Sequence, residues 1–213
     1  MSVQFVPTGT VEVPEISFKS SVTLPAAKTA VVVGDMQNDF VKPEGKLTVP
    51  AAAETVPFIQ QLLAMARLHK VPIAYTQDTQ VPEDPEFDIW PEHCVKGTWG
   101  WEIIEELTPH ADDLVSPKYR YDGFYAGPLD HFLSHVWHVE YVILVGTVSN
   151  ICVLHTAASA GMRWFHVVVP ANGISALHDF GQAVALYQIA ALYKSSVLRS
   201  VEHIHFKVQS EIS

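Results

Sequence analysis

The sequence predicts an α/β protein with a doubly wound, mostly parallel, six-stranded sheet and helices on both faces. Three observations support this fold class. Short apolar runs recur along the chain, segments with helical spacing separate them, and polar side chains follow several of the runs. Strands that alternate with helices form parallel βαβ units, so the runs are expected to lie side by side in one sheet.

The predicted elements follow an irregular start. Pro7, Pro14 and Pro25 prevent a long helix in residues 1–28, so we expect an N-terminal extension or arm there and one domain over residues 29–213. The first strand is the continuous apolar run of residues 30–33, and the first long helix has apolar residues at helical spacing and ends in basic residues. Strands are expected at residues 30–33, 72–76, 114–115, 141–145, 165–169 and 196–198, and helices at residues 51–70, 129–137, 151–161 and 178–193.

Composition excludes several classes of function. The 213 residues carry a formal net charge of -10 and only 13 Lys and Arg, so a general nucleic-acid surface is not expected. The sequence has no apolar run of the roughly 18 to 20 residues that span a bilayer, and its start does not resemble a signal peptide, so we expect no membrane association. Only Cys94 and Cys152 are present, which favours free thiols and a cytoplasmic location.

Three residues with complementary chemistry follow strands. Asp35 comes directly after the first strand, Lys118 soon after the third, and Cys152 lies in the turn between the fourth strand and its helix. Ligands of doubly wound sheets bind at the carboxyl ends of the strands, where strand order reverses. A carboxylate can take the proton of a thiol there, and an ammonium favours the thiolate. Each residue alone also fits an ordinary role: a buried thiol, a turn carboxylate and a surface lysine.

Cys152 is expected close to the start of its helix. Unpaired backbone N–H groups and the positive end of the helix dipole lower the pKa of a thiol at such a position, and the same amides could hold an oxyanion. We therefore expect a reactive thiolate. A non-catalytic chain that acts as a binding module, with an unreactive Cys152, remains the alternative from another class.

Four stretches carry a resemblance to the isochorismatase-like cysteine hydrolases, which include nicotinamidases, ureidoacrylate amidohydrolases and N-carbamoylsarcosine amidases. They are GDMQNDF from Gly34, WPEHCVKGTWG from Trp90, KYRYDGFYAGPLD from Lys118 and GTVSNICVLHTAASAG from Gly146. The resemblance implies an isochorismatase-like, Rossmann-like fold. It also implies that Asp35 is the base, Lys118 its cationic partner and Cys152 the nucleophile in the hydrolysis of a small-molecule amide to a carboxylic acid and ammonia through a thioester.

The resemblance further implies a backbone feature beside the nucleophile. A cis peptide is expected at Thr147-Val148, with the amides of Val148 and Cys152 as the oxyanion hole. Members that cleave the ether-type bond of isochorismate lack this cysteine, so Cys152 speaks against that reaction.

The metal pattern of nicotinamidases is only partly present. In the family an Asp-x-His pair and the His of Trp-Pro-x-His-Cys bind a divalent ion; here Asp78 and His93 match, but Gln80 replaces the middle histidine. Glu86 lies where some members supply a further carboxylate. We expect a metal site of Asp78, Glu86 and His93, with Gln80 as an additional candidate, that would hold Zn, Mn or Fe. The acidic loop also fits a plain solvated surface.

The substrate class stays open between two branches. The stretch from Trp90 favours a nicotinamidase or pyrazinamidase, whereas Gln80 and the stretch from Lys118 favour a ureido or N-carbamoyl amidohydrolase. The resemblance gives Phe40, Trp90, Tyr121 and Phe124 as candidate walls of a substrate pocket. Family members are usually oligomers, so a homo-oligomer is expected.

Overall fold

The six expected strands form one parallel sheet, to which two strands of two residues are added. The structure is a computed structural model that describes residues 9–10, 12–193 and 195–207. The strand order is β1-β9-β7-β6-β3-β4-β5, and β8 also pairs with β6. The strands are β1 (Phe18–Lys19), β3 (Thr29–Gly34), β4 (Ile73–Asp78), β5 (Leu114–Lys118), β6 (Tyr141–Thr147), β7 (His166–Pro170), β8 (Ile174–Ser175) and β9 (Ser196–Leu198). Since β3 has β4 on one side and β6 on the other, strand order reverses at β3, which confirms the doubly wound fold.

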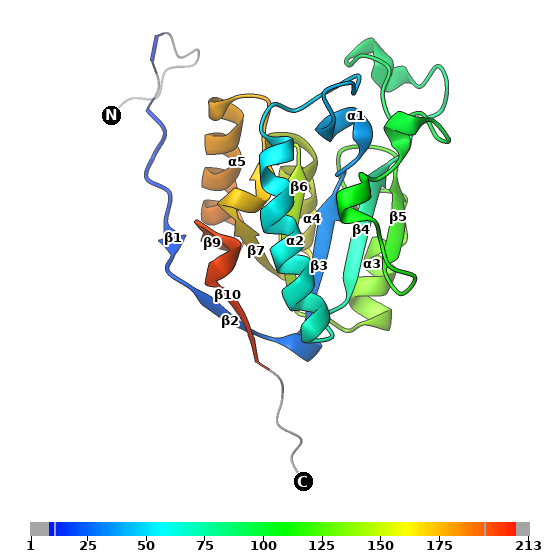
Figure 1. The fold of residues 1–213 in the computed structure, drawn as a ribbon. Helices are drawn as coiled ribbons and strands as arrows, with labels where there is room; N and C mark the ends of the chain where they lie inside the picture. Colours follow the sequence, from blue (N-terminus) through cyan, green and yellow to red (C-terminus); the bar gives the residue numbers. More distant parts are fainter. Residues whose placement is uncertain (1–8, 11, 194, 208–213) are drawn as a thin grey trace.

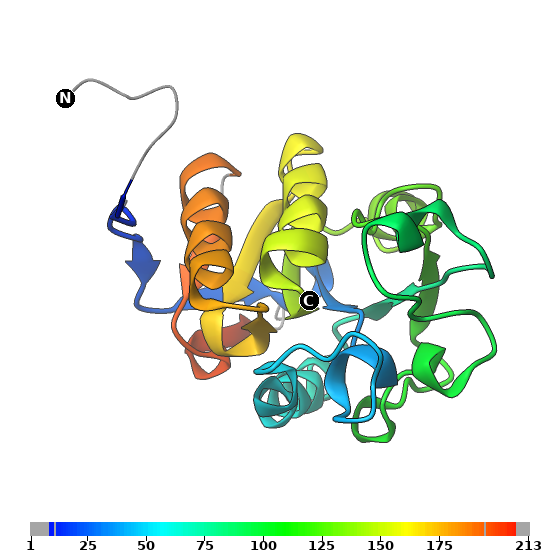
Figure 2. The same cartoon turned by 90° about the horizontal axis from the view of Figure 1, so that it is seen from above.

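Helices cover both faces of the sheet. The helices are α1 (Asn38–Val41), α2 (Ala52–Leu68), α3 (Leu129–His131), α4 (Leu154–Met162) and α5 (Asp179–Leu192). Helix α2 lies on one face, and α3, α4 and α5 lie on the other (Figures 1 and 2). The helix expected at residues 129–137 consists of α3 followed by a π-helical turn over Phe132–Val136. A second π-helical turn, Ser149–Val153, leads into α4.

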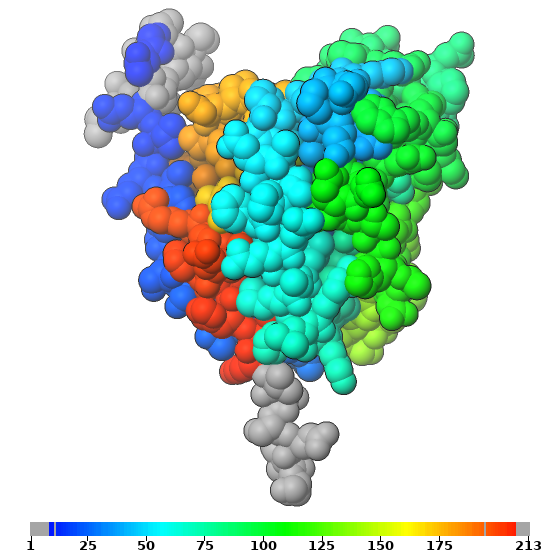
Figure 3. Space-filling view, viewed as in Figure 1, coloured from blue at the N-terminus to red at the C-terminus, as the bar shows by residue number. Residues whose placement is uncertain are grey.

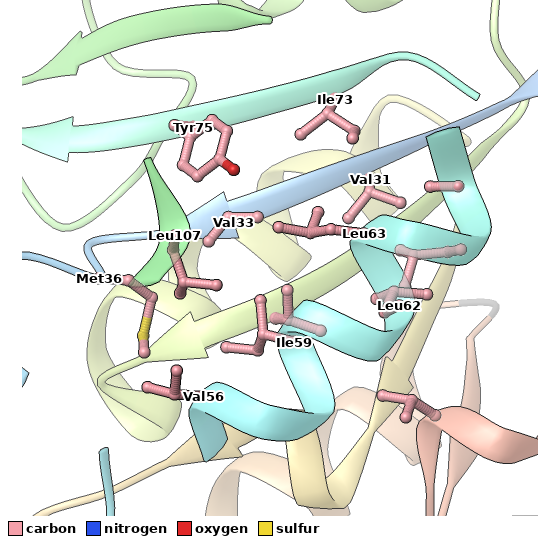
Figure 4. Close-up of a cluster of buried hydrophobic side chains, with 14 of the residues drawn as sticks. Val31, Val33, Met36, Val56, Ile59, Leu62, Leu63, Ile73, Tyr75 and Leu107 are labelled. Atoms are coloured by element: carbon pink, nitrogen blue, oxygen red, sulfur yellow. The ribbon is translucent and has the colours of Figure 1, made fainter. Parts of the chain in front are cut away.

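The buried face of α2 packs on the sheet because its apolar residues recur at helical spacing. Ile59 and Leu62 belong to the same core cluster as Val31 and Val33 of β3 (Figure 4). The alternate residues of β3, including Val32, belong to a second cluster on the opposite face. Because both faces of β3 are buried, neither set of its alternating side chains faces solvent, which explains its continuous apolar sequence.

Part of the predicted N-terminal arm folds back on its own chain. Strand β1 pairs with β9, and β2 (Val22–Pro25) forms a separate parallel pair with β10 (Ile204–Lys207). Figure 3 shows the C-terminal segment in red packed between α2 and the N-terminal segment. Residues 1–8 and 11 of the arm lie outside the described residues. Within the part of the chain that the structure describes, no helix is both long enough and apolar enough to cross a bilayer.

The carboxyl ends of the central strands lie together at the top of Figure 1, beside α1. The connection from β4 to β5 contains three short 3-10 helices: η2 (Pro85–Asp88), η3 (Trp99–Trp101) and η4 (Glu105–Leu107). Its surface lies next to that of α1 (Figure 3). Side chains from this connection can therefore reach the edge of the sheet where the three candidate residues lie.

Candidate active site

Neighbouring strands bring the three candidate catalytic residues together. Asp35 follows β3, Lys118 is the last residue of β5, and Cys152 lies in the π-helical turn that follows β6. Strand β4 lies between β3 and β5, and its last residue, Asp78, is in register with Lys118. Asp35 adopts a left-handed backbone conformation with φ 53°, which Asp tolerates better than most residues.

Lys118 lies between two buried carboxylates. Its Nζ is 2.7 Å from Oδ1 of Asp78 and 3.2 Å from Oδ2 of Asp35, and it also donates to the carbonyl oxygen of Arg120 at 3.0 Å. The hydroxyl of Thr76 donates to the other oxygen of Asp35 at 3.2 Å. Among the described residues, Oδ2 of Asp35 accepts no well-directed hydrogen bond, so one of its lone pairs is free to take a proton.

The two carboxylates differ in proton affinity because they differ in partners. Burial raises the pKa of Asp35 to about 6; Lys118 acts in the opposite direction, and the charge of Asp78 adds to the rise. Burial also acts to raise the pKa of Asp78, but Lys118 and His93 outweigh it and hold that pKa at about 2. Burial acts to lower the pKa of Lys118, and the two carboxylates raise it well above its usual value. Asp35 is therefore the carboxylate suited to exchange protons near neutral pH.

The thiol of Cys152 is not held as a thiolate at rest. Burial raises its pKa well above the usual value, and the attraction of Lys118 does not overcome this. Lys118 and a protonated His93 would only balance Asp35 and Asp78, so a thiolate would add an uncompensated negative charge to a buried site. The pKa lowering expected from the start of the helix is thus wrong. Proton transfer from Cys152 to Asp35 avoids the problem because it leaves the total charge unchanged.

The turn before Cys152 has the expected cis peptide. The Thr147-Val148 peptide is cis. The carbonyl oxygen of Val148 accepts hydrogen bonds from the amides of Ile151 and Val153 at 3.0 and 3.2 Å, which fix the turn around Cys152. Val148 and Cys152 both line the pocket described next, as an oxyanion hole would require.

A small pocket opens onto Cys152. Three of the four expected walls line it, namely Phe40, Trp90 and Tyr121, and the indole N–H of Trp90 donates to the hydroxyl of Tyr121 at 2.9 Å. Phe124 was expected to be the fourth wall. It instead packs in the core with its ring stacked on that of Phe165, because its loop turns inward onto α4.

Several site residues were not identified from the sequence. The pocket is also lined by Leu47, Ile151 and Leu177, which are single apolar residues in loops and at a helix start and carry no pattern that could have indicated them. The role of Asp78 as the closer carboxylate partner of Lys118 was missed as well. Its position at the carboxyl end of β4, like that of Asp35 directly after β3, was a signal that could have found it.

His93 interacts with Asp78 at the edge of this pocket. Its Nε2 lies 3.2 Å from Oδ2 of Asp78, and its Nδ1 lies 2.7 Å from the carbonyl oxygen of Pro91. A carbonyl can only accept, so Nδ1 carries a proton, and Nε2 needs a second proton to donate to Asp78. Burial acts to lower the pKa of His93, but these two hydrogen bonds outweigh it and the pKa is raised.

The residues expected to bind a metal do not fit a zinc site as they are placed. The described parts of the chain contain no group of three or more His, Cys, Asp and Glu side chains that could hold a metal ion. Asp78 is already bound by Lys118 and His93, and Gln80 Nε2 donates to its two oxygens at 3.3 and 3.4 Å. Catalytic zinc sites usually have three protein ligands, and the expected third ligand, Glu86, does not form such a group with Asp78 and His93.

Comparison with known proteins agrees with this architecture. Residues 29–199 match the isochorismatase domain family. The N-carbamoylsarcosine amidase of Thermoplasma acidophilum is 35% identical with a TM-score of 0.73, and the match covers 81% of this chain and 96% of that one. The nicotinamidase of Bacillus subtilis is 27% identical with a TM-score of 0.76, covering 81% and 100%. The pyrazinamidase of Pyrococcus horikoshii, solved in complex with zinc, is 24% identical with a TM-score of 0.75, covering 80% and 98%, and indicates the shared fold.

The chain belongs to the isochorismatase family of hydrolases. Its fold class and the resemblance seen in the four sequence stretches are thereby confirmed.

Proposed function

We propose that this protein hydrolyses a small-molecule amide to a carboxylic acid and ammonia, with Cys152 as nucleophile. The single observation that carries the proposal is the set of charged groups at the carboxyl end of β3, where strand order reverses. A thiol that lines a pocket shares a buried site with one carboxyl of raised pKa, Asp35, and with an ammonium, Lys118, that both carboxylates hold in place.

The chemistry proceeds in two acyl-transfer steps. As Sγ of Cys152 attacks the amide carbon, the thiol proton moves to Oδ2 of Asp35, and the amides of Val148 and Cys152 stabilise the oxyanion. Asp35 then gives this proton to the departing nitrogen, the C–N bond breaks, and ammonia leaves a thioester. A water next gives a proton to Asp35 and attacks the thioester carbon. The sulfur leaves, recovers the proton from Asp35, and the acid is released.

Lys118 positions the base and limits its charge. By pairing with Asp35 and Asp78 at once, it keeps both carboxylates in the buried site and stabilises Asp35 whenever Asp35 is ionised. It does not take part in the bonds that form or break.

The direct test uses purified protein and a panel of amides that includes nicotinamide, pyrazinamide and N-carbamoyl amino acids, with ammonia as the readout. Release by the wild-type protein, and its loss in Cys152→Ala and Asp35→Asn, is the expected result. A variant with unchanged turnover after loss of the sulfur would contradict the proposed mechanism.

Two substrate branches remain proposals. A nicotinamidase or pyrazinamidase activity is supported by the aromatic walls Trp90 and Tyr121 and by the likeness to the nicotinamidase. A ureido or N-carbamoyl amidohydrolase is supported by Gln80 and by the higher identity to the N-carbamoylsarcosine amidase. Ammonia from carbamoyl compounds alone would select the second branch.

A metal ion, a homo-oligomer and a cytoplasmic location are separate proposals. Elemental analysis of the purified protein tests the metal, and no step above depends on it. Sedimentation velocity tests the oligomer, and fractionation of cells tests the location.

A further inference from the structure

The pocket contains one buried acceptor atom that nothing in the described chain satisfies. Glu86 lies on η2 with 7% of its surface exposed, it lines the pocket together with Cys152, and its Oε2 has no hydrogen-bond partner. A buried carboxylate oxygen without a partner costs on the order of 1 to 3 kcal/mol or more, so such groups are rare unless a ligand completes them.

The other polar side chains of the pocket already have partners. Asp78 is bound by Lys118 and His93, and the hydroxyl of Tyr121 accepts from Trp90. Of the described side chains that line the pocket, Glu86 alone has a buried polar atom left without a hydrogen bond.

The local structure holds Glu86 in this position. Its backbone N–H donates to Oδ1 of Asp84 at 2.9 Å, and Asp84 is the N-cap of the short helix with Pro85 as its first residue. The carbonyl oxygen of Glu86 accepts from the amides of Ile89 and Trp90. The backbone that carries the Glu86 side chain is therefore already ordered before a ligand arrives.

Burial and the charge of Asp78 raise the pKa of Glu86, and Arg120 acts in the opposite direction without donating a hydrogen bond to Oε2. Nη1 of Arg120 lies 3.9 Å from Oε2 of Glu86, beyond hydrogen-bond distance, and 3.3 Å from Asp84. The Arg120 side chain is 42% exposed, so solvent reaches it. The geometry therefore leaves Oε2 of Glu86 without a hydrogen bond from any described residue, in a side chain that lines the pocket.

We infer that Glu86 determines specificity by accepting a hydrogen bond from the end of the substrate that is remote from the amide under attack, so that the enzyme prefers amides whose remote end carries an N–H donor or a cation. This inference rests on the proposed function of the same pocket. When an amide carbon lies against the sulfur of Cys152, the rest of the ligand contacts the aromatic and aliphatic walls, and Glu86 is the acceptor that remains. A lone pair at the remote end, such as that of a pyridine nitrogen, would face a carboxylate and be disfavoured.

The test compares three ring amides of similar size. The remote end of 3-aminobenzamide carries an N–H donor, that of nicotinamide carries an acceptor, and that of benzamide carries neither. Dissociation constants are measured by calorimetry with Cys152→Ser, which binds without turnover, in the presence and absence of Glu86→Gln. The donor amide is expected to bind about 10- to 100-fold more tightly than nicotinamide, and Glu86→Gln is expected to remove most of that ratio. Asp88→Asn, an exposed carboxylate on the same helix, is the matched control and should leave the ratio unchanged.

The outcomes separate this inference from the proposed function. Equal affinities, failure of the donor amide to bind, tighter binding of nicotinamide, or a ratio that Glu86→Gln leaves unchanged would each overturn the inference. The same titration after treatment with a chelator checks for a metal held by Glu86: a preference that vanishes with the metal also overturns it. If the preference is found but the wild-type protein releases no ammonia from any amide, the inference stands and the proposed hydrolysis fails.

Discussion

The ammonium of Lys118 lies closer to Asp78, at 2.7 Å, than to Asp35, at 3.2 Å. Asp78, the last residue of β4, thus has the closer contact with the positive charge, and Asp35, which follows β3, keeps a pKa that burial raises. Because the two carboxyl groups differ in pKa, Asp78 stays ionised at neutral pH whereas Asp35 can exchange protons.

Replacement of Lys118 by Met should destabilise the fold strongly. Both carboxylates would lose their cation in a buried site, which costs about 3 to 5 kcal/mol when one partner of a buried ion pair is removed. Urea unfolding at pH 7 measures the loss. Lys96→Met, at an exposed lysine, should change the unfolding free energy by less than about 1 kcal/mol. Equal stability of the two variants would show that Lys118 is not needed to balance the carboxylates.

The pH dependence of turnover should report the proton affinity of Asp35. Because Asp35 accepts the thiol proton only when ionised, kcat/KM for an active amide should fall tenfold per pH unit below about pH 6. Asp78→Asn should move this limb to lower pH, since the charge of Asp78 contributes to the raised pKa of Asp35 and its loss leaves Lys118 to Asp35 alone. Circular dichroism at each pH checks that the fold persists. A limb that stays in place or moves to higher pH would contradict the assignment of Asp35 as the base.

Asp35 should also lower the free energy of unfolding at neutral pH. Its pKa is about 6 in the folded protein against 3.8 in an unfolded chain, so the folded state binds the proton more tightly. The contribution of the Asp35 carboxyl to the free energy of unfolding therefore falls as pH rises from about 4 to 6 and stays low above that range. The unfolding free energy of Asp35→Asn relative to wild type should increase by about 3 kcal/mol over this window. A difference in unfolding free energy between Asp35→Asn and wild type that is constant with pH would contradict the raised pKa of Asp35.

The two cysteines should differ in reaction with iodoacetamide. Cys152 lines the pocket with 7% of its surface exposed, whereas Cys94 is fully buried, and burial raises the pKa of Cys94 far above its usual value. Alkylation at Cys152 should be the faster reaction, and its rate should climb steadily above pH 8 because the resting thiol is protonated. Mass spectrometry of peptides from wild type and Cys152→Ala measures both sites. Equal, slow labelling at both positions would favour a non-catalytic family member.

The place of the three candidate catalytic residues could be predicted from the sequence because each has a fixed relation to a strand. An apolar run ending in Gly34 places Asp35 at the carboxyl edge, and parallel pairing brings Lys118 and Cys152 to the same edge whatever the loops do. The pKa of the thiol could not be predicted in this way. The start of a helix is visible in the sequence, but the depth at which the sulfur is buried depends on the packed loops above it.

The walls of the pocket could be predicted only in part, for a related reason. Trp90 and Tyr121 belong to motifs with a fixed place in the fold, whereas Leu47 and Leu177 reach the pocket through the course of loops that have no periodicity. Phe124 shows the reverse case. An aromatic residue two positions beyond Asp122 looks equally able to face a ligand or the core, and the contact of its loop with α4 decides for the core.

Gly146 should be irreplaceable because it allows β3 and β6 to approach at the switch point. Its φ is +115°, and a Cβ at this position would lie 2.0 Å from the backbone oxygen of Gly34, the residue before Asp35. Gly146→Ala must therefore push apart β3 and β6, the strands that precede Asp35 and Cys152. Gly97 has a similar φ of +83° with open space around its Cβ position, so Gly97→Ala isolates the cost of the backbone conformation, about 1 to 2 kcal/mol. We expect Gly146→Ala to lose a further ~1 to 3 kcal/mol in unfolding free energy, as overpacked sites do, and to lose ammonia release as well. Equal thermal stability of the two alanine variants would mean that the strands separate without cost, and the close approach would then have no part in building the site.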